Sequence, residues 1–359
     1  MESSYILKDS LIPLVNYLSE DDFDLDILTP GSHTLMHIDL SQKNLEIVMN
    51  SISDYDLQLL GSLDDIYRPR KLRSAIADML MLSGFLPPRG IDELLSVLLG
   101  KSSESRELAI CLDTNILFNR ILSQYVLPRL LRTEKSLNIL IPRQVEAEVG
   151  SNLSRDVKRT RNLSKILQAL RESEMKLFFK VYGAGAPSLE ARKAAMAIHE
   201  LGVLERYRGL IKIYRSSELV TPGLRPDFLI VNSCKRIAEE NSFELLILTM
   251  DEDTRTCARM LRCNVVKLIP QTNFPYLIEN LPLINISELL YVAAMSLGFI
   301  RLRVGAAALE LIGSWSGKSF EEWKQGKLLL RYPKISILSK HIRRVLKADS
   351  IFTALRMVS

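Results

Sequence analysis

Four acidic residues lie where the sequence changes from one expected element to the next. Asp113 ends the apolar run ELAICLD, and Asp251 ends the run FELLILTMD. Glu148 and Asp227 lie near the beginning of two expected helices, and Asp253 follows Asp251 by two residues. Two carboxylates about 4 Å apart repel by roughly 4 kcal/mol at an effective dielectric constant of 20, so a converging set requires a bound cation or raised pKa values. An all-oxygen set of this kind suits Mg²⁺ or Mn²⁺ rather than zinc.

Each acidic residue by itself also has an ordinary structural explanation. Asp113 is suited to cap a helix, and Asp227, Asp251 and Asp253 are each suited to the positive end of a helix dipole. Capping is the better interpretation of any one of them, whereas the set as a whole favours a metal site. Glu146 is an alternative to Glu148, but the two side chains point to different sides of a helix because they are two residues apart.

Alternating strands and helices are expected to bring these residues together. Near-continuous apolar runs predict buried strands, which together with the intervening helical segments indicate a parallel sheet with right-handed connections. The expected strands are residues 107–113, 136–142, 209–217, 243–251 and 264–270. Ligands bind outside the carboxyl ends of the strands in such sheets. We therefore expect Asp113 and Asp251 at one edge, where the helices carrying Glu148 and Asp227 begin.

The order of the short motifs resembles that of a PIN domain. Asp113-Thr114-Asn115 follows a strand, and Pro142 to Glu148 reads P-x-x-V-x-x-E. Pro226-Asp227-Phe228 then opens a helix, and Thr249-Met250-Asp251-Glu252-Asp253 follows another strand. The resemblance covers about residues 107–270. It implies a five-stranded parallel sheet with helices on both faces, and a divalent-metal nuclease that acts mainly on RNA.

The resemblance also implies roles for individual residues. The catalytic acids would be Asp113, Glu148, Asp227 and Asp251. The metal, Mg²⁺ or Mn²⁺, would be held by Asp113 and Asp227 with Asp251 and Asp253, the last through water. Thr114, Asn115 and Thr249 would support the acids. The cation would activate a water molecule that hydrolyses an RNA phosphodiester bond, with cleavage inside the chain expected.

The chain departs from a minimal PIN domain in two ways. A long helical insertion at about 153–209 separates the second acid from the third, and the domain has a flank on each side. We expect a mixed unit of unknown role at 1–106, the PIN-like domain at 107–270 and a mostly helical unit at 271–359. The apolar stretch 286–313 contains Arg301 and Arg303, so it is interpreted as two core helices rather than a membrane span.

Composition sets broad limits on the class of protein. The chain has 359 residues, 47% of them hydrophobic and 25% charged, with a net charge of +5. These values are ordinary for globular proteins. The four cysteines, Cys111, Cys234, Cys257 and Cys263, form no C-x-x-C pair. They are expected to be reduced core thiols in a cytoplasmic protein.

The expected partner is RNA. The segment SRDVKRTRNLSK follows the helix that bears Glu148, and it could hold a phosphate backbone without sequence preference. Its basic residues are Arg155, Lys158, Arg159, Arg161 and Lys165. A solvated helix face explains them equally well. The resemblance makes a homodimer a further expectation, and neither a membrane nor an organic cofactor is expected.

Two other functions stay open at this point. The domain could be a catalytically inactive PIN-like module that binds RNA or a protein partner. It could also be a structure-specific DNA nuclease, which would prefer branched DNA to single-stranded RNA.

Overall fold

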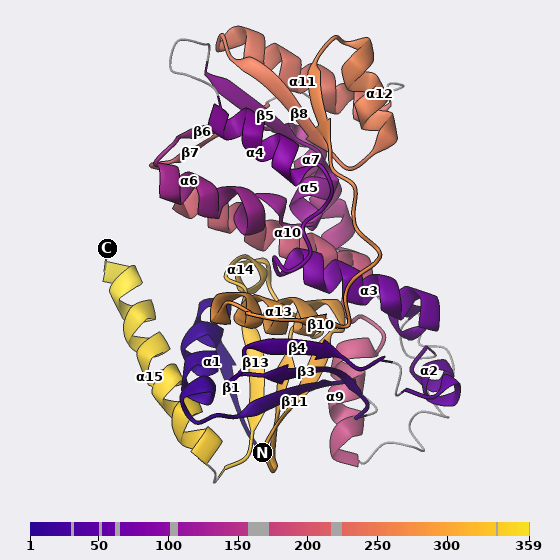
Figure 1. The fold of residues 1–359 in the computed structure, drawn as a ribbon, viewed down its shortest axis with the longest axis vertical. Helices are drawn as coiled ribbons and strands as arrows, with labels where there is room; N and C mark the ends of the chain where they lie inside the picture. Colours follow the sequence, from indigo (N-terminus) through magenta and orange to yellow (C-terminus); the bar gives the residue numbers. More distant parts are fainter. Residues whose placement is uncertain are drawn as a thin grey trace. The chain divides into compact units, whose positions relative to one another are not determined.

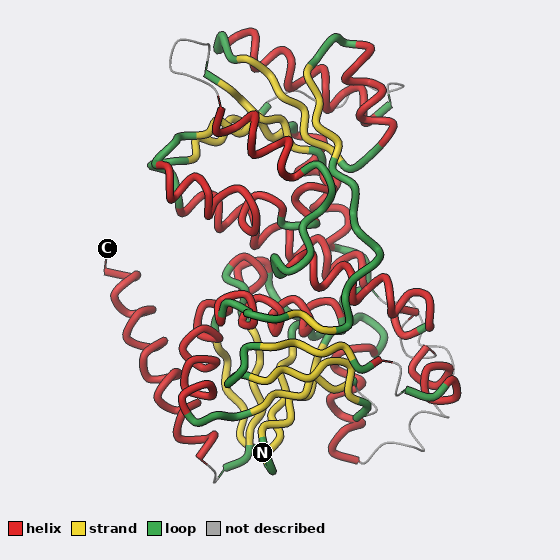
Figure 2. Tube along the Cα trace, viewed as in Figure 1, coloured by secondary structure: helices red, strands yellow, loops and turns green. Residues whose placement is uncertain are grey.

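The computed structural model divides the chain into two compact units, shown in Figures 1 and 2. It describes residues 1–29, 32–49, 52–61, 65–100, 107–156, 172–216, 225–334 and 337–358. The first unit combines Met1–Ser83, Arg155–Arg192 and Thr272–Ser359, and the second combines Gly84–Ser154 and Lys193–Gln271. This differs from the expected three consecutive units, because residues from both ends of the chain share one unit.

The first unit is built on an eight-stranded antiparallel sheet with the order β1-β13-β12-β11-β2-β3-β4-β10. Its strands are β1 (Glu2–Ile6), β2 (Asp24–Leu28), β3 (Thr34–Asp39), β4 (Asn44–Ile47), β10 (Leu277–Ile278), β11 (Phe299–Val304), β12 (Ala307–Ile312) and β13 (Leu328–Tyr332). The central pair joins β11 to β2, with Leu302 opposite Ile27. Figure 1 shows the indigo N-terminal strands and the yellow-orange C-terminal strands within this one sheet.

Helices pack around this sheet. They are the 3₁₀ turns η1 (Lys8–Ser10) and η3 (Asp65–Tyr67) and the helices α1 (Leu11–Glu20), α2 (Asp54–Gly61), α3 (Pro69–Leu82), α9 (Glu172–Tyr182), α13 (Leu283–Ser296), α14 (Phe320–Lys324) and α15 (Ile337–Val358). Helix α13 is buried along most of its length and packs against α1, α3 and β11. It therefore forms the centre of the apolar core of the first unit.

The segment 271–359, expected to be a mostly helical unit, contains strands as well as helices. Four of the eight strands, β10 to β13, lie in this segment. In 286–313 only the first half forms a helix, α13, and the second half forms the hairpin of β11 and β12. Arg301 and Arg303 alternate with the buried Ile300, Leu302 and Val304. This alternation has the period of a strand with one solvated face, not that of a helix.

The second unit contains the expected five-stranded parallel sheet. Its order is β7-β6-β5-β8-β9, and all four neighbouring pairs are parallel. The strands are β5 (Leu108–Leu112), β6 (Leu137–Ile141), β7 (Ile211–Arg215), β8 (Glu244–Thr249) and β9 (Asn264–Lys267). Each lies within one of the five predicted strands. The α/β class predicted from the apolar runs is therefore confirmed for this unit.

Helices flank the parallel sheet. They are α4 (Ile91–Gly100), α5 (Thr114–Phe118), the π-helical turn η4 (Leu122–Val126), α6 (Leu127–Thr133), α7 (Arg143–Leu153), α11 (Pro226–Glu240) and α12 (Glu252–Met260). Helix α11 contacts β5, β6 and β8 as well as α7 and α12. Together these strands and helices enclose one apolar core that includes Ile110, Leu140 and Ile247.

The predicted insertion is helical where the structure describes it. It contains α9 and α10 (Leu189–Arg206), while residues 157–171 lie outside the described residues. The insertion is divided between the units, because Arg155–Arg192 belong to the first unit and the residues from Lys193 on, including most of α10, belong to the second. Across the parts of the chain that the structure describes, no helix has the length and apolar character needed to cross a membrane.

The shared antiparallel sheet predicts that neither end of the chain folds without the other. A chain that stops at Gln271 lacks β11, so β2 loses the strand that pairs with Asp26, Ile27 and Leu28. Backbone amides in β2 to β4 are expected to lose protection in hydrogen exchange. Protection of β5, in the second unit, serves as the internal control. Full protection of β2 in the shortened chain would contradict the prediction.

Candidate active site

Three acidic residues are positioned by the parallel sheet, whose strands all end at one edge. Asp113 comes directly after the central strand β5 and precedes α5 as its N-cap residue. Asp251 follows the neighbouring strand β8 and caps α12, where its Oδ1 accepts a hydrogen bond from the backbone N–H of Asp253 at 2.7 Å. Asp227 lies in the first turn of α11, which packs against β5 and β8. The suggested side-chain cap thus exists for Asp251, whereas the Asp113 side chain forms no cap hydrogen bond, and both residues lie at one edge of the sheet.

Helix α11 is joined to β5 by a disulfide. Cys111 and Cys234 form this bond, and their Cα atoms are 5.9 Å apart. Cys111 lies two residues before Asp113, on the same face of the strand. Cys234 lies seven residues after Asp227, two turns along the same face of the helix. The face of α11 that carries Asp227 is therefore the face that packs on the Asp113 side of β5.

The expectation of four reduced thiols was wrong for this pair. Cys111 and Cys234 are both fully buried, whereas Cys257 and Cys263 are free and partly exposed. The two bonded cysteines are 123 residues apart in sequence. Their contact depends on the packing of α11 on β5, so spacing along the chain gave no signal for it. Disulfides are typical of oxidising environments and of intracellular proteins of hyperthermophiles, and cytoplasmic location stays a prediction.

Three threonines hold three of the acids. The Thr249 hydroxyl donates a hydrogen bond to Asp113 Oδ2 at 2.7 Å. Thr254 donates to Asp227 Oδ1 at 2.8 Å. Thr114 donates to Glu148 Oε2 at 2.7 Å. Each contact crosses from one element to another, so each fixes the orientation of a carboxylate relative to a neighbouring strand or helix.

Thr114 and Thr249 were expected as supporting residues, and Thr254 was missed. Thr254 stands three residues after Asp251, on the first turn of α12. Residues i and i+3 of a helix share a face, which is the sequence signal that could have identified it. Thr249 has a second contact, because its Oγ1 accepts a hydrogen bond from the backbone N–H of Asp251 at 2.9 Å. Thr249 therefore links the Asp113 side chain to the Asp251 backbone.

Asp113 is the most buried of the acids, with 4% of its surface exposed. Burial raises the pKa of its carboxyl above the ordinary value, and the negative charges of Asp251 and Asp227 raise it further. Hydrogen bonds from Thr249 and from the backbone of Thr114 act in the opposite direction. The contribution of Asp251 and Asp227 indicates that these charges act on the same buried carboxyl.

The thiol of Cys257, on α12, responds to a further pair of these charges. Burial is the largest cause of its raised pKa, and the charges of Asp227 and Asp253 add to it. Asp253 and Asp227 thus act on one part of α12. The charge of Asp227 therefore acts on both Asp113 and Cys257.

Glu148 and Glu146 have different partners. Glu148 is exposed and is tied to Thr114, the residue that follows Asp113. Glu146 instead accepts a hydrogen bond from Arg215 at 2.8 Å. Of the two alternatives, Glu148 is therefore the one connected to the acidic edge. Asn115 is partly buried, and its backbone oxygen accepts a hydrogen bond from the Asn119 side chain.

The chemistry of this donor set suits a hard divalent cation, because every acidic side chain offers oxygen. Within the described ranges of the chain, no three His, Cys, Asp or Glu side chains come close enough together to hold an ion. The arrangement is therefore a cluster of negative charge around a buried aspartate, and the carboxylates would have to approach one another to bind a cation.

The expected RNA-binding residues are mostly outside the described part of the chain. Arg155 is exposed just after α7, at the beginning of the insertion. Lys158, Arg159, Arg161 and Lys165 lie in residues 157–171, which the structure does not describe.

Comparisons with known proteins do not assign a family. No family model matches the sequence, and no curated protein matches it. One solved structure that matches part of the chain is a domain of a functionally unknown protein from Methanocaldococcus jannaschii DSM 2661. It is 14% identical, and the match covers 50% of this chain and 99% of that chain with a TM-score of 0.28. A TM-score this low does not establish a shared fold.

The disulfide predicts a large stability difference between the oxidised and reduced protein. Cys111 and Cys234 close a loop with a sequence separation of 123 residues. The chain-entropy treatment gives a stabilisation of about 5 kcal/mol for a loop of this length. Urea unfolding with and without a reductant, with loss of protection in β5 as the signal, measures this difference. The Cys257→Ser variant should keep the difference, and equal stability of the two forms would contradict the prediction.

The raised pKa of Asp113 predicts that Asp113→Asn stabilises the protein at neutral pH. The unfolded carboxyl releases its proton at lower pH than the folded one, so folding stability falls as pH rises from 3.8 through the folded pKa. Asparagine removes this penalty, and its advantage over the wild type should therefore grow with pH until the folded pKa has been passed. Urea unfolding between pH 4 and pH 8 measures the trend.

Glu252→Gln, at the start of α12, provides a control of opposite sign. The hydrogen bond from Lys267 lowers the pKa of Glu252. Its charge therefore stabilises the folded state above the ordinary pKa, and this contribution is lost as the pH falls through the folded value. The glutamine variant should be the less stable protein at neutral pH and approach the wild type in acid. The same pH trend in both variants would contradict the assignment.

Proposed function

We propose that this protein is a divalent-metal-dependent nuclease that cleaves phosphodiester bonds within RNA. The single observation that supports the proposal most is the buried Asp113 at the carboxyl end of the central strand, with the charges of Asp227 and Asp251 acting on it. A protein gains no stability from such a carboxylate, and perturbed acids of this kind concentrate at functional sites.

The residues have distinct roles in this proposal. Asp113 and Asp227 hold Mg²⁺ or Mn²⁺, and Glu148 and Asp251 bind it directly or through water, with Asp253 farther out. When bound there, a cation would lower the pKa of a water molecule and would offset negative charge on the phosphate. Thr249, Thr254 and Thr114 each occupy one oxygen of their carboxylate. This leaves the second oxygen of each acid to face a cation, and it limits rotation of the side chains as the ion binds.

The raised pKa of Asp113 makes the proposed binding of metal dependent on pH. A cation competes with the proton for the carboxyl, so binding strengthens as the pH rises through the pKa of Asp113. Removing the hydrogen bond from Thr249 would raise that pKa further, since this bond favours the charged form. Thr249 is therefore a positioning residue in the proposal, acting through Asp113.

A second function has its own support. The described residues contain no group of three side chains placed to hold a metal ion. This observation favours a PIN-like module that binds RNA or a protein without cutting it. Under that alternative, the acidic edge would be a recognition surface.

Nuclease activity is tested on the full-length protein with single- and double-stranded RNA and DNA, in Mn²⁺ or in EDTA. We expect Mn²⁺-dependent cleavage of single-stranded RNA. Changing a residue that only supports a metal ligand lowers activity 10–100-fold. Changing a ligand itself should do more, so we expect Asp113→Asn and Asp227→Asn each to lower the cleavage rate more than about 100-fold. Glu146→Gln is the matched control on α7, because this acid pairs with Arg215 and should leave the rate near that of the wild type.

The possible results separate the candidates. Cleavage that persists in Asp227→Asn would contradict the assigned site. Preferential cutting of branched DNA would instead support a structure-specific DNA nuclease. Binding of RNA with no cleavage, and no binding of Mn²⁺ that depends on Asp113, would support the inactive module.

A further inference from the structure

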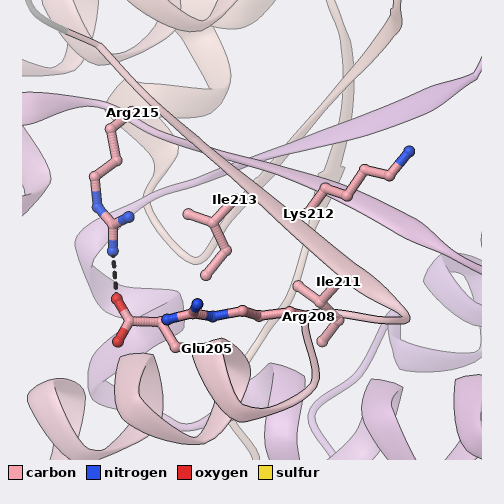
Figure 3. Close-up of a pocket in the computed structure, with 6 residues that line it drawn as sticks. All are labelled: Glu205, Arg208, Ile211, Lys212, Ile213 and Arg215. Atoms are coloured by element: carbon pink, nitrogen blue, oxygen red, sulfur yellow. Dashed lines mark hydrogen bonds and ion pairs between the residues drawn. The ribbon is translucent and has the colours of Figure 1, made fainter.

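A pocket of about 300 Å³ lies along β7, the outer strand of the parallel sheet. Figure 3 shows the six residues that line it, Glu205, Arg208, Ile211, Lys212, Ile213 and Arg215. All six belong to the second unit, between the last turn of α10 and the end of β7. The pocket is thus part of the unit that carries the acidic residues, although the proposed chemistry does not use it.

The pocket has more positive than negative charge. Arg215 is already engaged, since its Nη2 donates to Glu205 at 2.7 Å and its Nε donates to Glu146 at 2.8 Å. Arg208 and Lys212 are exposed, and no described residue forms a hydrogen bond or ion pair with either side chain. In Figure 3 the Lys212 amino group points away from Glu205 and Arg215. Arg208 is therefore available to an anionic ligand inside the pocket, and Lys212 is available beside it, on the other face of β7.

The floor of the pocket is apolar and its side is an open strand edge. Ile211 and Ile213 face it between the charged residues. The order of the sheet ends at β7, so one side of this strand has no partner strand among the described residues. Lysines on an edge strand commonly prevent pairing with other chains. An apolar pocket does not prevent such pairing. Protection of the strand edge therefore explains Lys212 but not the pocket beside it.

The register of the sheet relates the pocket to the acidic edge. Arg215 is opposite Ile141 of β6, and the preceding Leu140 of β6 is opposite Cys111 of β5. Arg215 is therefore level with Leu112, one residue before Asp113. Two strand spacings separate β7 from β5, which places their ends about 10 Å apart. The pocket runs from Arg215 back toward Arg208, and so leads away from the edge at which Asp113 lies.

We propose that this pocket binds the backbone of a single-stranded RNA whose neighbouring segment lies at the acidic edge. Phosphates would contact Arg208 and Lys212, and a sugar or base would lie on Ile211 and Ile213. The inference rests on the proposed function and names a substrate-binding surface for it. Contacts of this kind hold the backbone without reading sequence. They also compensate for the repulsion between the substrate and the acids before a cation binds.

The test measures RNA binding without cleavage, with the full-length Asp113→Asn protein as the background. Fluorescence anisotropy with a labelled single-stranded RNA gives the association constant over a range of salt concentrations. For single strands the logarithm of this constant falls with the logarithm of salt by about 0.7 per phosphate contact. Adding Arg208→Gln and Lys212→Gln should therefore reduce the slope by about 1.4, equally for RNAs of unrelated sequence.

The matched control is Arg129→Gln with Arg132→Gln, two exposed arginines on α6 that do not line the pocket. This pair removes the same charge and should leave the slope unchanged. An equal loss of slope in both double variants would overturn the proposal, because it would indicate a general effect of net charge. An unchanged slope in the pocket variant would also overturn it. Neither result bears on whether the wild type cleaves RNA in Mn²⁺, so the two proposals fail separately.

Discussion

The packing of α11 on the central strand β5 is the contact on which the acidic site depends. Asp227 and Asp113 are more than a hundred residues apart in sequence, and nothing local holds them together. The Cys111–Cys234 bond fixes the two elements within 5.9 Å between Cα atoms, two residues from one acid and two helical turns from the other. Apolar residues on both sides of this contact, including Ile110 and Ile230, belong to one core cluster. The apolar packing and the disulfide therefore hold the same face of α11 against β5.

The threonine hydroxyls fix the orientation of individual carboxylates. Helix and strand packing determines which carboxylates share a neighbourhood, and the threonines determine how each of them is turned. Thr249 is fully buried and contacts both the Asp113 carboxylate and the Asp251 backbone. Because burial and like charge raise the pKa of Asp113 while this hydroxyl lowers it, the ionisation of the residue is balanced between opposing effects. The proposed nuclease would use that balance by letting a cation replace the proton.

The sequence allowed the parallel sheet to be predicted because its strands are apolar and contiguous. Segments such as the one ending at Asp113 need no distant partner to be recognised, and parallel strands then place their last residues at one edge. The antiparallel sheet was harder, because its central pair joins β2 to β11 from opposite ends of the chain. The apolar stretch that contains Arg301 and Arg303 also predicts a core helix, whereas both arginines lie in the strand β11. The disulfide and the Thr254–Asp227 contact escaped prediction because both arise from packing between elements.

The division of the first sheet between the two ends of the chain has a consequence for synthesis on the ribosome. From Leu28, the last residue of β2, to Phe299, the first of β11, the difference is 299 − 28 = 271 residues. At 5–20 residues per second, about 14–54 s pass before the partner strand has been made. The acid-bearing sheet, complete at Lys267, is translated in full during this interval. On the ribosome, β2 therefore lacks its partner strand β11 during a period in which all strands of the parallel sheet have already been synthesised.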